Sequence, residues 1–171
     1  MKTLIVIDMQ NDFIDGALGT PEAQAIVPKV KKKIEEYRER GGQVVFTRDT
    51  HSPAYLCTQE GRKLPVEHCI IGSYGWEVKE EFEAPEEDCI NKHNFGYHGW
   101  SSDCFGHWPG EIELVGLCTD ICIVSNALIL KAKFPCNEIT VDASCCAGTT
   151  PENHKAALQV MKCCQINVVG E

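Results

Sequence analysis

The chain has 171 residues, a length that fits one domain, and its 43% hydrophobic and 24% charged residues are typical of a soluble globular protein. A formal net charge of -9 argues against a nucleic-acid binder or a protein that adheres to anionic membranes, because both need a basic surface. No apolar run, residues 4–7 included, is long enough to cross a membrane, and Asp8 interrupts the N-terminal run too early for a signal peptide. We therefore expect one cytoplasmic domain, residues 1–171, without nucleic-acid or membrane partners.

Eleven cysteines are many for a chain of this length. A disulfide framework is disfavoured, because the number is odd, no export signal is present, and Cys145–Cys146 and Cys163–Cys164 are adjacent pairs. The sequence has no CxxC pair from which a zinc ribbon could be built. We expect most of them to be reduced and buried, as small apolar side chains are.

Short apolar runs alternate with helical patterns along the chain, which is typical of a parallel α/β sheet. In chain order the patterns predict a strand over 3–7, a helix over 23–40, a strand over 43–47, a long loop over 48–75, a short helix over 76–82, strands over 88–91 and 112–116, a helix over 121–133, a strand over 138–141, a helix over 151–163 with Thr150 as its N-cap, and a strand over 166–169. The prediction is a three-layer α/β/α fold with a roughly six-stranded parallel sheet. In such sheets the active site lies at the carboxyl ends of the strands.

Three residues with chemical potential follow predicted strands. Asp8 ends the first strand, Lys92 follows the third, and Cys122 lies where the chain turns from the fourth strand into a helix. A helix N-terminus lowers the pKa of a cysteine and offers free N–H groups for an oxyanion hole. Cys118 lies on the same turn, so the pattern alone favours Cys122 as nucleophile without excluding Cys118. We expect Asp8 to take the thiol proton and Lys92 to stabilise the developing charge.

A second group of polar residues, Asp49, His51, Glu60 and His68, follows the second strand. Together they form a mixed nitrogen and oxygen set suited to zinc, iron or manganese. The alternative is a polar loop whose histidines only form hydrogen bonds. The remaining histidines lack such a grouping, and we predict no metal site from them; they are His93, His98, His107 and His154.

Five motifs together resemble the isochorismatase-like cysteine hydrolases and, among these, the nicotinamidases. The motifs are VIDMQNDF at 6–13, TRDTH at 47–51, EGRKLPVEHC at 60–69, NK at 91–92 and GLCTDICI at 116–123. Their order and spacing extend over nearly the whole chain. The resemblance implies that Asp8, Lys92 and Cys122 form a catalytic triad. It also implies a cis peptide bond between Leu117 and Cys118, which assigns the backbone N–H groups of Cys118 and Cys122 to the oxyanion hole.

Within this family the Asp-x-His and later His cluster is a feature of nicotinamidases that isochorismatases lack. The resemblance places it on Asp49, His51 and His68, with Glu60 matching an extra carboxylate of some members. It implies a divalent metal, zinc before iron or manganese, that binds the pyridine nitrogen of nicotinamide. The implied substrate-binding residues are Phe13, Leu64, Phe95 and Leu117. One departure from the family pattern is that Leu64-Pro65 stands where many nicotinamidases carry a Trp or Phe against the ring.

The expected activity is hydrolysis of nicotinamide to nicotinate and ammonia through a thioester on Cys122, a step in NAD salvage. Three alternatives are a related cysteine hydrolase of another small amide or ureido compound, an isochorismatase-type vinyl-ether hydrolase, and a non-catalytic metal-binding or redox protein. The metal cluster disfavours the second. The expected partner is a small-molecule amide substrate, and a homo-oligomer is compatible with the sequence.

Overall fold

A computed structural model describes residues 2–105 and 109–171, so His107 lies outside the described residues. Within these residues six strands form one parallel sheet in the order β3-β2-β1-β4-β5-β6. The strands are β1 (Lys2–Ile7), β2 (Gln43–Asp49), β3 (Cys89–Lys92), β4 (Glu111–Leu117), β5 (Ile139–Ala147) and β6 (Asn167–Val169). The chain order reverses between β1 and β4, and at such a point the strand ends leave room for a ligand.

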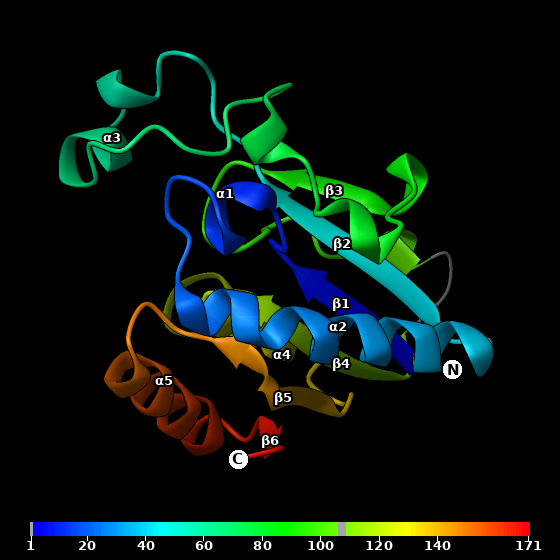
Figure 1. The fold of residues 1–171 in the computed structure, drawn as a ribbon. Helices are drawn as coiled ribbons and strands as arrows, with labels where there is room; N and C mark the ends of the chain where they lie inside the picture. Colours follow the sequence, from blue (N-terminus) through cyan, green and yellow to red (C-terminus); the bar gives the residue numbers. More distant parts are fainter. Residues whose placement is uncertain (1, 106–108) are drawn as a thin grey trace.

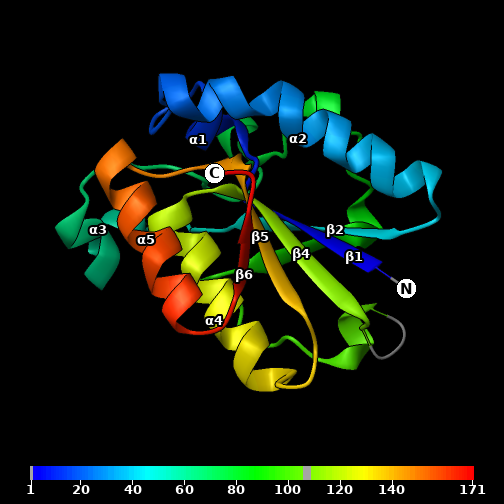
Figure 2. The same cartoon turned by 90° about the horizontal axis from the view of Figure 1, so that it is seen from below.

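Helices cover both faces of this sheet (Figures 1 and 2). They are α1 (Asn11–Ile14), α2 (Pro21–Glu39), α4 (Val124–Lys133) and α5 (Pro151–Cys163). A further helix, α3 (Gln59–Lys63), lies away from the sheet on the long loop after β2 (Figure 1). In Figure 2, α1 and α2 lie on one side of the strands, and α4 and α5 lie on the other. The three-layer α/β/α prediction is therefore confirmed.

Each face of the sheet has its own apolar core, because successive side chains of a strand point to opposite faces. In β1, Ile5 and Ile7 belong to the cluster under α4 and α5, whereas Leu4 and Val6 belong to the cluster under α2. Gly116 allows β4 to lie close to β1, since a Cβ at this position would meet the carbonyl oxygen of Ile7. This close packing aligns the carboxyl ends of the central strands.

The two main connecting helices begin as their sequences indicate. The side chains of Thr20 and Thr150 accept hydrogen bonds from Ala23 N and Asn153 N, so both threonines are N-caps. Each is followed by a proline at the first helical position, where no N–H is needed.

The structure differs from the predicted elements in three places. Strand β5 extends to Ala147, six residues beyond its predicted end, because Cys146 and Ala147 pair with Gly116 and Leu117 of β4 and most of the run is buried. In place of one helix over 76–82 there are 3-10 turns at Tyr74–Trp76 and Glu80–Phe82, separated by a bridge between Gln10 and Val78. The helices α1 and α3 were not predicted, since each has only four or five residues.

The cysteines also differ in part from the expectation. All eleven are free thiols, but only four are buried, Cys69, Cys122, Cys145 and Cys146. Four others are exposed, Cys57, Cys136, Cys163 and Cys164. The prediction that most cysteines are buried is therefore wrong, because the four exposed ones lie at the ends of short turns and helices or just after them, where the chain faces solvent. Among the described residues, no helix combines the length and the apolar character needed to cross a membrane.

Candidate active site

The carboxyl ends of β1, β2, β3 and β4 bring four predicted residues together. Asp8 directly follows β1 in a left-handed backbone conformation with a φ of 50°, and it is fully buried. Its Oδ1 accepts a hydrogen bond of 2.7 Å from the hydroxyl of Thr47 on β2. One carboxylate oxygen is thereby held, and the other lies 2.7 Å from the ammonium of Lys92.

Lys92, the last residue of β3, lies at the centre of the charged groups. Its Nζ lies 2.7 Å from Asp8 Oδ2, 3.3 Å from Asp49 Oδ1 and 3.5 Å from Cys122 Sγ. It also donates to the carbonyl oxygen of Asn94 at 3.2 Å, and its side chain is 1% exposed. A buried ammonium with this many acceptors is held in one position and stays charged.

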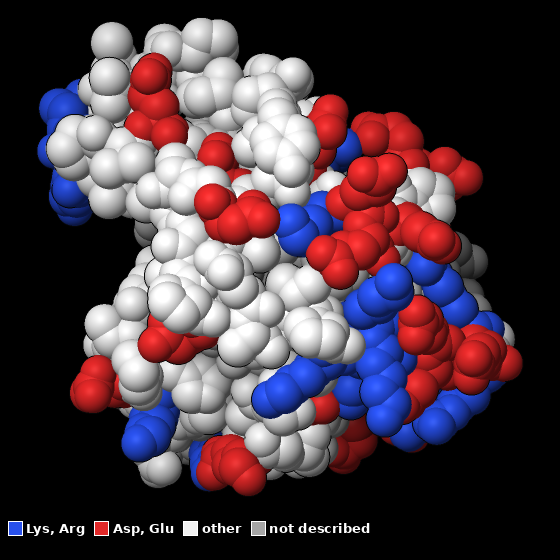
Figure 3. Space-filling model, viewed as in Figure 1, with Lys and Arg blue, Asp and Glu red and all other residues white. Residues whose placement is uncertain are grey.

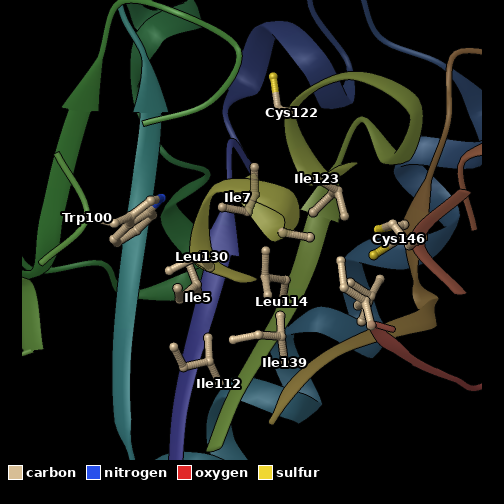
Figure 4. Packing of buried hydrophobic residues seen from close by; sticks show 14 of the residues in the cluster. Ile5, Ile7, Trp100, Ile112, Leu114, Cys122, Ile123, Leu130, Ile139 and Cys146 are labelled. Carbon is tan, nitrogen blue, oxygen red and sulfur yellow. The ribbon is translucent and has the colours of Figure 1, made fainter. Parts of the chain in front are cut away.

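Cys122 lies in a π-helical turn, Thr119–Ile123, that leads from β4 into α4. Figure 4 shows its sulfur at the upper end of the apolar cluster, directed away from Ile7 and the side chains below. The peptide bond between Leu117 and Cys118 is cis, as the resemblance implies. The predicted triad residues thus approach one another, although they come from three separate strand ends.

The pKa of Cys122 differs from the expected direction. Burial raises the pKa of Cys122 well above its usual range, and the neighbouring Lys92 only partly offsets this. The helix-terminus argument predicted a lowered pKa, and it is wrong for this structure because the thiol is almost fully buried and faces two carboxylates. Burial also raises the pKa of Asp8, despite the opposing charge of Lys92. The resting pair is therefore a neutral thiol beside a carboxylate of increased basicity.

Asp49, His51, Glu60 and His68 form a second cluster beside the first. Each offers a ligand atom, and these atoms lie within 4.8 Å of one another. The Nε2 of His51 is 3.0 Å from Asp49 Oδ2 and 3.7 Å from Glu60 Oε1, and the Nε2 of His68 is 3.8 Å from Asp49 Oδ2. The bridge between His51 and Ile70 returns the chain to this point and so places His68 near His51.

The donor set fits a divalent transition metal. Two imidazoles and two carboxylates suit zinc, iron or manganese. The Nδ1 of His68 lies 2.8 Å from the carbonyl oxygen of Val66. A carbonyl accepts only, so Nδ1 carries the proton and the lone pair of Nε2 faces the cluster, which is the usual arrangement of a metal-binding histidine.

A cavity of about 620 Å³ connects the two clusters. The predicted substrate-binding residues Phe13, Leu64, Phe95 and Leu117 all line it. So do Cys118, Cys122, Asp49, Glu60 and His68. In Figure 3 charged side chains crowd the lower right, over the carboxyl half of α2, whereas uncharged side chains border most of the hollow below α3. The cavity therefore suits a largely apolar molecule with a few polar atoms.

Two buried amides that support the site were not predicted. Gln10 donates to Asp49 O at 2.9 Å and accepts from Asp49 N at 2.7 Å, and so it fixes the backbone at a predicted ligand. Asn126 donates to the carbonyl oxygen of Cys122 at 2.8 Å. A polar residue one helical turn after Cys122, on a face that is otherwise apolar, is the sequence signal that indicates its role.

The histidines outside the cluster have other partners. The Nδ1 of His93 lies 2.9 Å from the carbonyl oxygen of Thr50, and the Nδ1 of His154 lies 2.7 Å from the hydroxyl of Thr119. The ring of His98 lies 6.0 Å from that of Tyr97. None of these three is among the described residues that could hold a metal.

Known proteins are similar to this chain in fold and sequence. The chain is 32% identical over 180 residues to a probable inactive nicotinamidase from Arabidopsis thaliana, with 93% of this chain and 87% of that protein covered. The crystal structure of pyrazinamidase from Pyrococcus horikoshii in complex with zinc has a TM-score of 0.83 and 28% identity, with 99% of each chain covered. N-carbamoylsarcosine amidase from Thermoplasma acidophilum has a TM-score of 0.82 and 29% identity, with 98% of this chain and 95% of that chain covered. A model of the isochorismatase domain matches residues 2–170, and the chain therefore belongs to the isochorismatase family.

Proposed function

We propose that this protein is an amidase that hydrolyses nicotinamide to nicotinate and ammonia through a thioester on Cys122, as a cytoplasmic step of NAD salvage. The observation that carries the proposal is the position of the Asp49, His51, Glu60 and His68 cluster, part of which lines the same cavity as Cys122. A planar substrate can then reach the nucleophile with its carboxamide and the cluster with its ring nitrogen.

The first half of the reaction forms the thioester. The thiol proton of Cys122 passes to Asp8 while the sulfur bonds to the amide carbon, whose oxygen takes the negative charge. The backbone N–H groups of Cys118 and Cys122 donate to that oxygen. The C–N bond then breaks, and Asp8 returns the proton to the nitrogen, so that ammonia leaves. Lys92, 2.7 Å from Asp8 and 3.5 Å from Cys122, offsets the negative charge throughout.

The second half hydrolyses the thioester. A water molecule gives its proton to Asp8 as its oxygen bonds to the acyl carbon, and the C–S bond breaks as that proton returns to the sulfur of Cys122. The thiol is restored, and the product leaves as nicotinate after the new carboxylic acid loses its proton to solvent, where ammonia takes it up as ammonium. The raised pKa of Asp8 suits both halves, because a more basic carboxylate accepts the proton more readily.

Asp49, His51, Glu60 and His68 would hold the metal. Zinc bound there would act as a Lewis acid toward the pyridine nitrogen and orient the ring. The ring of Phe13 lies 5.5 Å from that of His68, which places an aromatic surface next to this position. Leu64 and Phe95 lie on other parts of the cavity wall.

A second candidate function is hydrolysis of a ureido compound, since N-carbamoylsarcosine amidase is among the similar structures. Such a substrate has no ring nitrogen for a metal. The Asp49 cluster therefore favours the aromatic amide. The likeness to a probable inactive nicotinamidase makes activity itself the first quantity to measure.

The experiment is an ammonia-release assay over nicotinamide, pyrazinamide, benzamide and N-carbamoylsarcosine, with zinc-loaded and chelator-treated protein. Nicotinamide should be hydrolysed with the highest kcat/KM, and benzamide, which lacks the ring nitrogen, should be poor. Metal removal and His51→Ala should each raise the KM for nicotinamide about 10–100-fold. Equal rates for benzamide and nicotinamide, or an unchanged KM after verified metal removal, would reject the substrate-binding metal. Hydrolysis of N-carbamoylsarcosine alone would establish the second candidate.

A further inference from the structure

Asn126 connects the catalytic helix to the loop that forms one wall of the cavity. It lies on α4 and is fully buried. Its Nδ2 donates to the carbonyl oxygens of Cys122, at 2.8 Å, and Phe95, at 3.1 Å. Its Oδ1 accepts from the backbone N–H of Tyr97 and from the indole N–H of Trp100, each at 2.9 Å.

The four partners determine how the amide is oriented. Two of the partners are carbonyl oxygens, which can only accept, and two are N–H groups, which can only donate. A flipped amide would therefore place acceptor against acceptor and donor against donor at all four contacts. The hydrogen-bonding capacity of the side chain is therefore fully used. A buried amide that is satisfied in this way holds its partners in a single arrangement.

Three of the four contacts belong to the loop after β3, which carries Phe95 into the cavity wall. The start of this loop is held by Lys92, which donates to Asn94 O at 3.2 Å. Gly96 lies so close to α4 that an added Cβ would meet side-chain atoms of Ser125 and Ile129. The side chain of Phe95 itself is 45% exposed, so burial alone does not fix its position.

We propose that Asn126 is a positioning residue that sets the distance between the Phe95 wall and the nucleophile Cys122. Through this contact the loop and the catalytic turn move as one unit, and the wall meets the substrate ring at a defined place. The consequence for substrate binding rests on the proposed amidase function. The mechanical connection does not rest on it, because it follows from the four hydrogen bonds alone.

Two substitutions distinguish the hydrogen bond to Cys122 from the three hydrogen bonds to the loop after β3. Asn126→Leu is close in size and removes all four hydrogen bonds. Asn126→Thr can still donate to the carbonyl four residues earlier, that of Cys122, as helical threonines do, but it releases the loop. Ala127→Gly is the matched control, since it lowers the helix propensity of α4 at a buried neighbouring position without removing any of the four hydrogen bonds of Asn126.

The first readout is the NMR signal of the Trp100 indole N–H, together with the hydrogen-exchange rate of the Tyr97 amide. Both variants of Asn126 should shift the indole signal and speed the exchange of Tyr97 at least about tenfold, a change of about 1.4 kcal/mol in local opening. The indole N–H of Trp76, which donates to Thr50 Oγ1 at 2.9 Å, is an internal reference and should not move. Ala127→Gly should leave all three signals near their wild-type values.

The second readout is the steady-state kinetics of nicotinamide hydrolysis. Both variants of Asn126 should raise KM about tenfold and change kcat by less than about threefold, because the wall binds the ring and takes no part in bond breaking. If Asn126→Thr retains the wild-type KM while Asn126→Leu does not, the residue acts through Cys122 and the proposal is overturned. Unchanged Tyr97 exchange in Asn126→Leu would overturn it as well. If the wild type releases no ammonia from nicotinamide but the Asn126 variants still exchange the Tyr97 amide faster, the proposed function is refuted and the connection is supported.

Discussion

Replacing Lys92 by methionine tests the charge arrangement of the site most directly. The Nζ atom lies 2.7 Å from Asp8 and 3.3 Å from Asp49, and the side chain is 1% exposed. Lys92→Met retains most of the side-chain volume but leaves the buried carboxylate of Asp8 without its counter-ion, whereas Asp49 keeps its contact with His51. Removing one partner of a buried ion pair costs about 3–5 kcal/mol, because the remaining charge is neither solvated nor paired.

Protonation sets an upper limit on this loss. A carboxyl group with an ordinary pKa of about 4 can be neutralised at pH 7 for about 4 kcal/mol, since each pH unit corresponds to about 1.4 kcal/mol. If keeping Asp8 buried as an anion cost more than this, the carboxylate would bind a proton instead. We therefore expect Lys92→Met to lower the unfolding free energy of the metal-free protein by about 3–4 kcal/mol.

The assay is urea unfolding of the wild type, Lys92→Met, Asp8→Asn and the double variant, followed by circular dichroism. The midpoint should fall in Lys92→Met with an unchanged m-value. The double variant should recover at least about 1 kcal/mol relative to Lys92→Met, because Asp8→Asn removes the carboxylate that lost its counter-ion, while Asp49 keeps its contact with His51. A loss of less than about 1 kcal/mol in Lys92→Met, or strictly additive effects in the double variant, would refute the reasoning.

The remaining predictions concern the nucleophile and the far end of the sheet. Cys122→Ala should abolish ammonia release with an unchanged thermal midpoint. Cys118→Ala should stay active, because only the backbone N–H of residue 118 is used. Turnover above background in Cys122→Ala would contradict the thioester. Burial tends to raise the pKa of Asp142, but hydrogen bonds from Lys33 and Ser144 lower it overall from 3.8. Asp142 therefore stabilises the fold above that pH and loses this contribution as the pH falls through its lowered value in the folded state. In Lys33→Met the thermal midpoint should fall less between about pH 5 and pH 2 than in the wild type, and equal falls would show that the pair does not lower the pKa.

Much of the sheet could be predicted, because short apolar runs followed by a single charged residue mark a buried parallel strand. The run that ends at Asp8 is of this kind, whereas the edge strand β3 before Lys92 is short and only partly buried. The end of β5 could not be predicted in the same way, since Asp142 and Ser144 interrupt the apolar pattern. Only the structure shows that Lys33, from a distant helix, pairs with Asp142 there.

The candidate site was predictable in its residues more than in its charges. Which side chains meet follows from the strand ends and from the family resemblance. The pKa of Cys122 does not, because burial depends on packing between segments far apart in the sequence, and that packing outweighs the helix terminus. Asn126 was missed for a similar reason, since its partners on the loop lie about 30 residues earlier.

The two clusters of the site differ in how the chain carries them, and this bears on how such enzymes diverge. Three of the four predicted ligands, His51, Glu60 and His68, lie on one continuous segment after β2, whereas Asp8, Lys92 and Cys122 lie at separate strand ends. A lineage can therefore alter or lose its ligand segment through local insertions and substitutions while the bond-breaking residues stay under separate selection. New substrates would then arise from changes in a single loop, with the hydrolytic chemistry inherited unchanged.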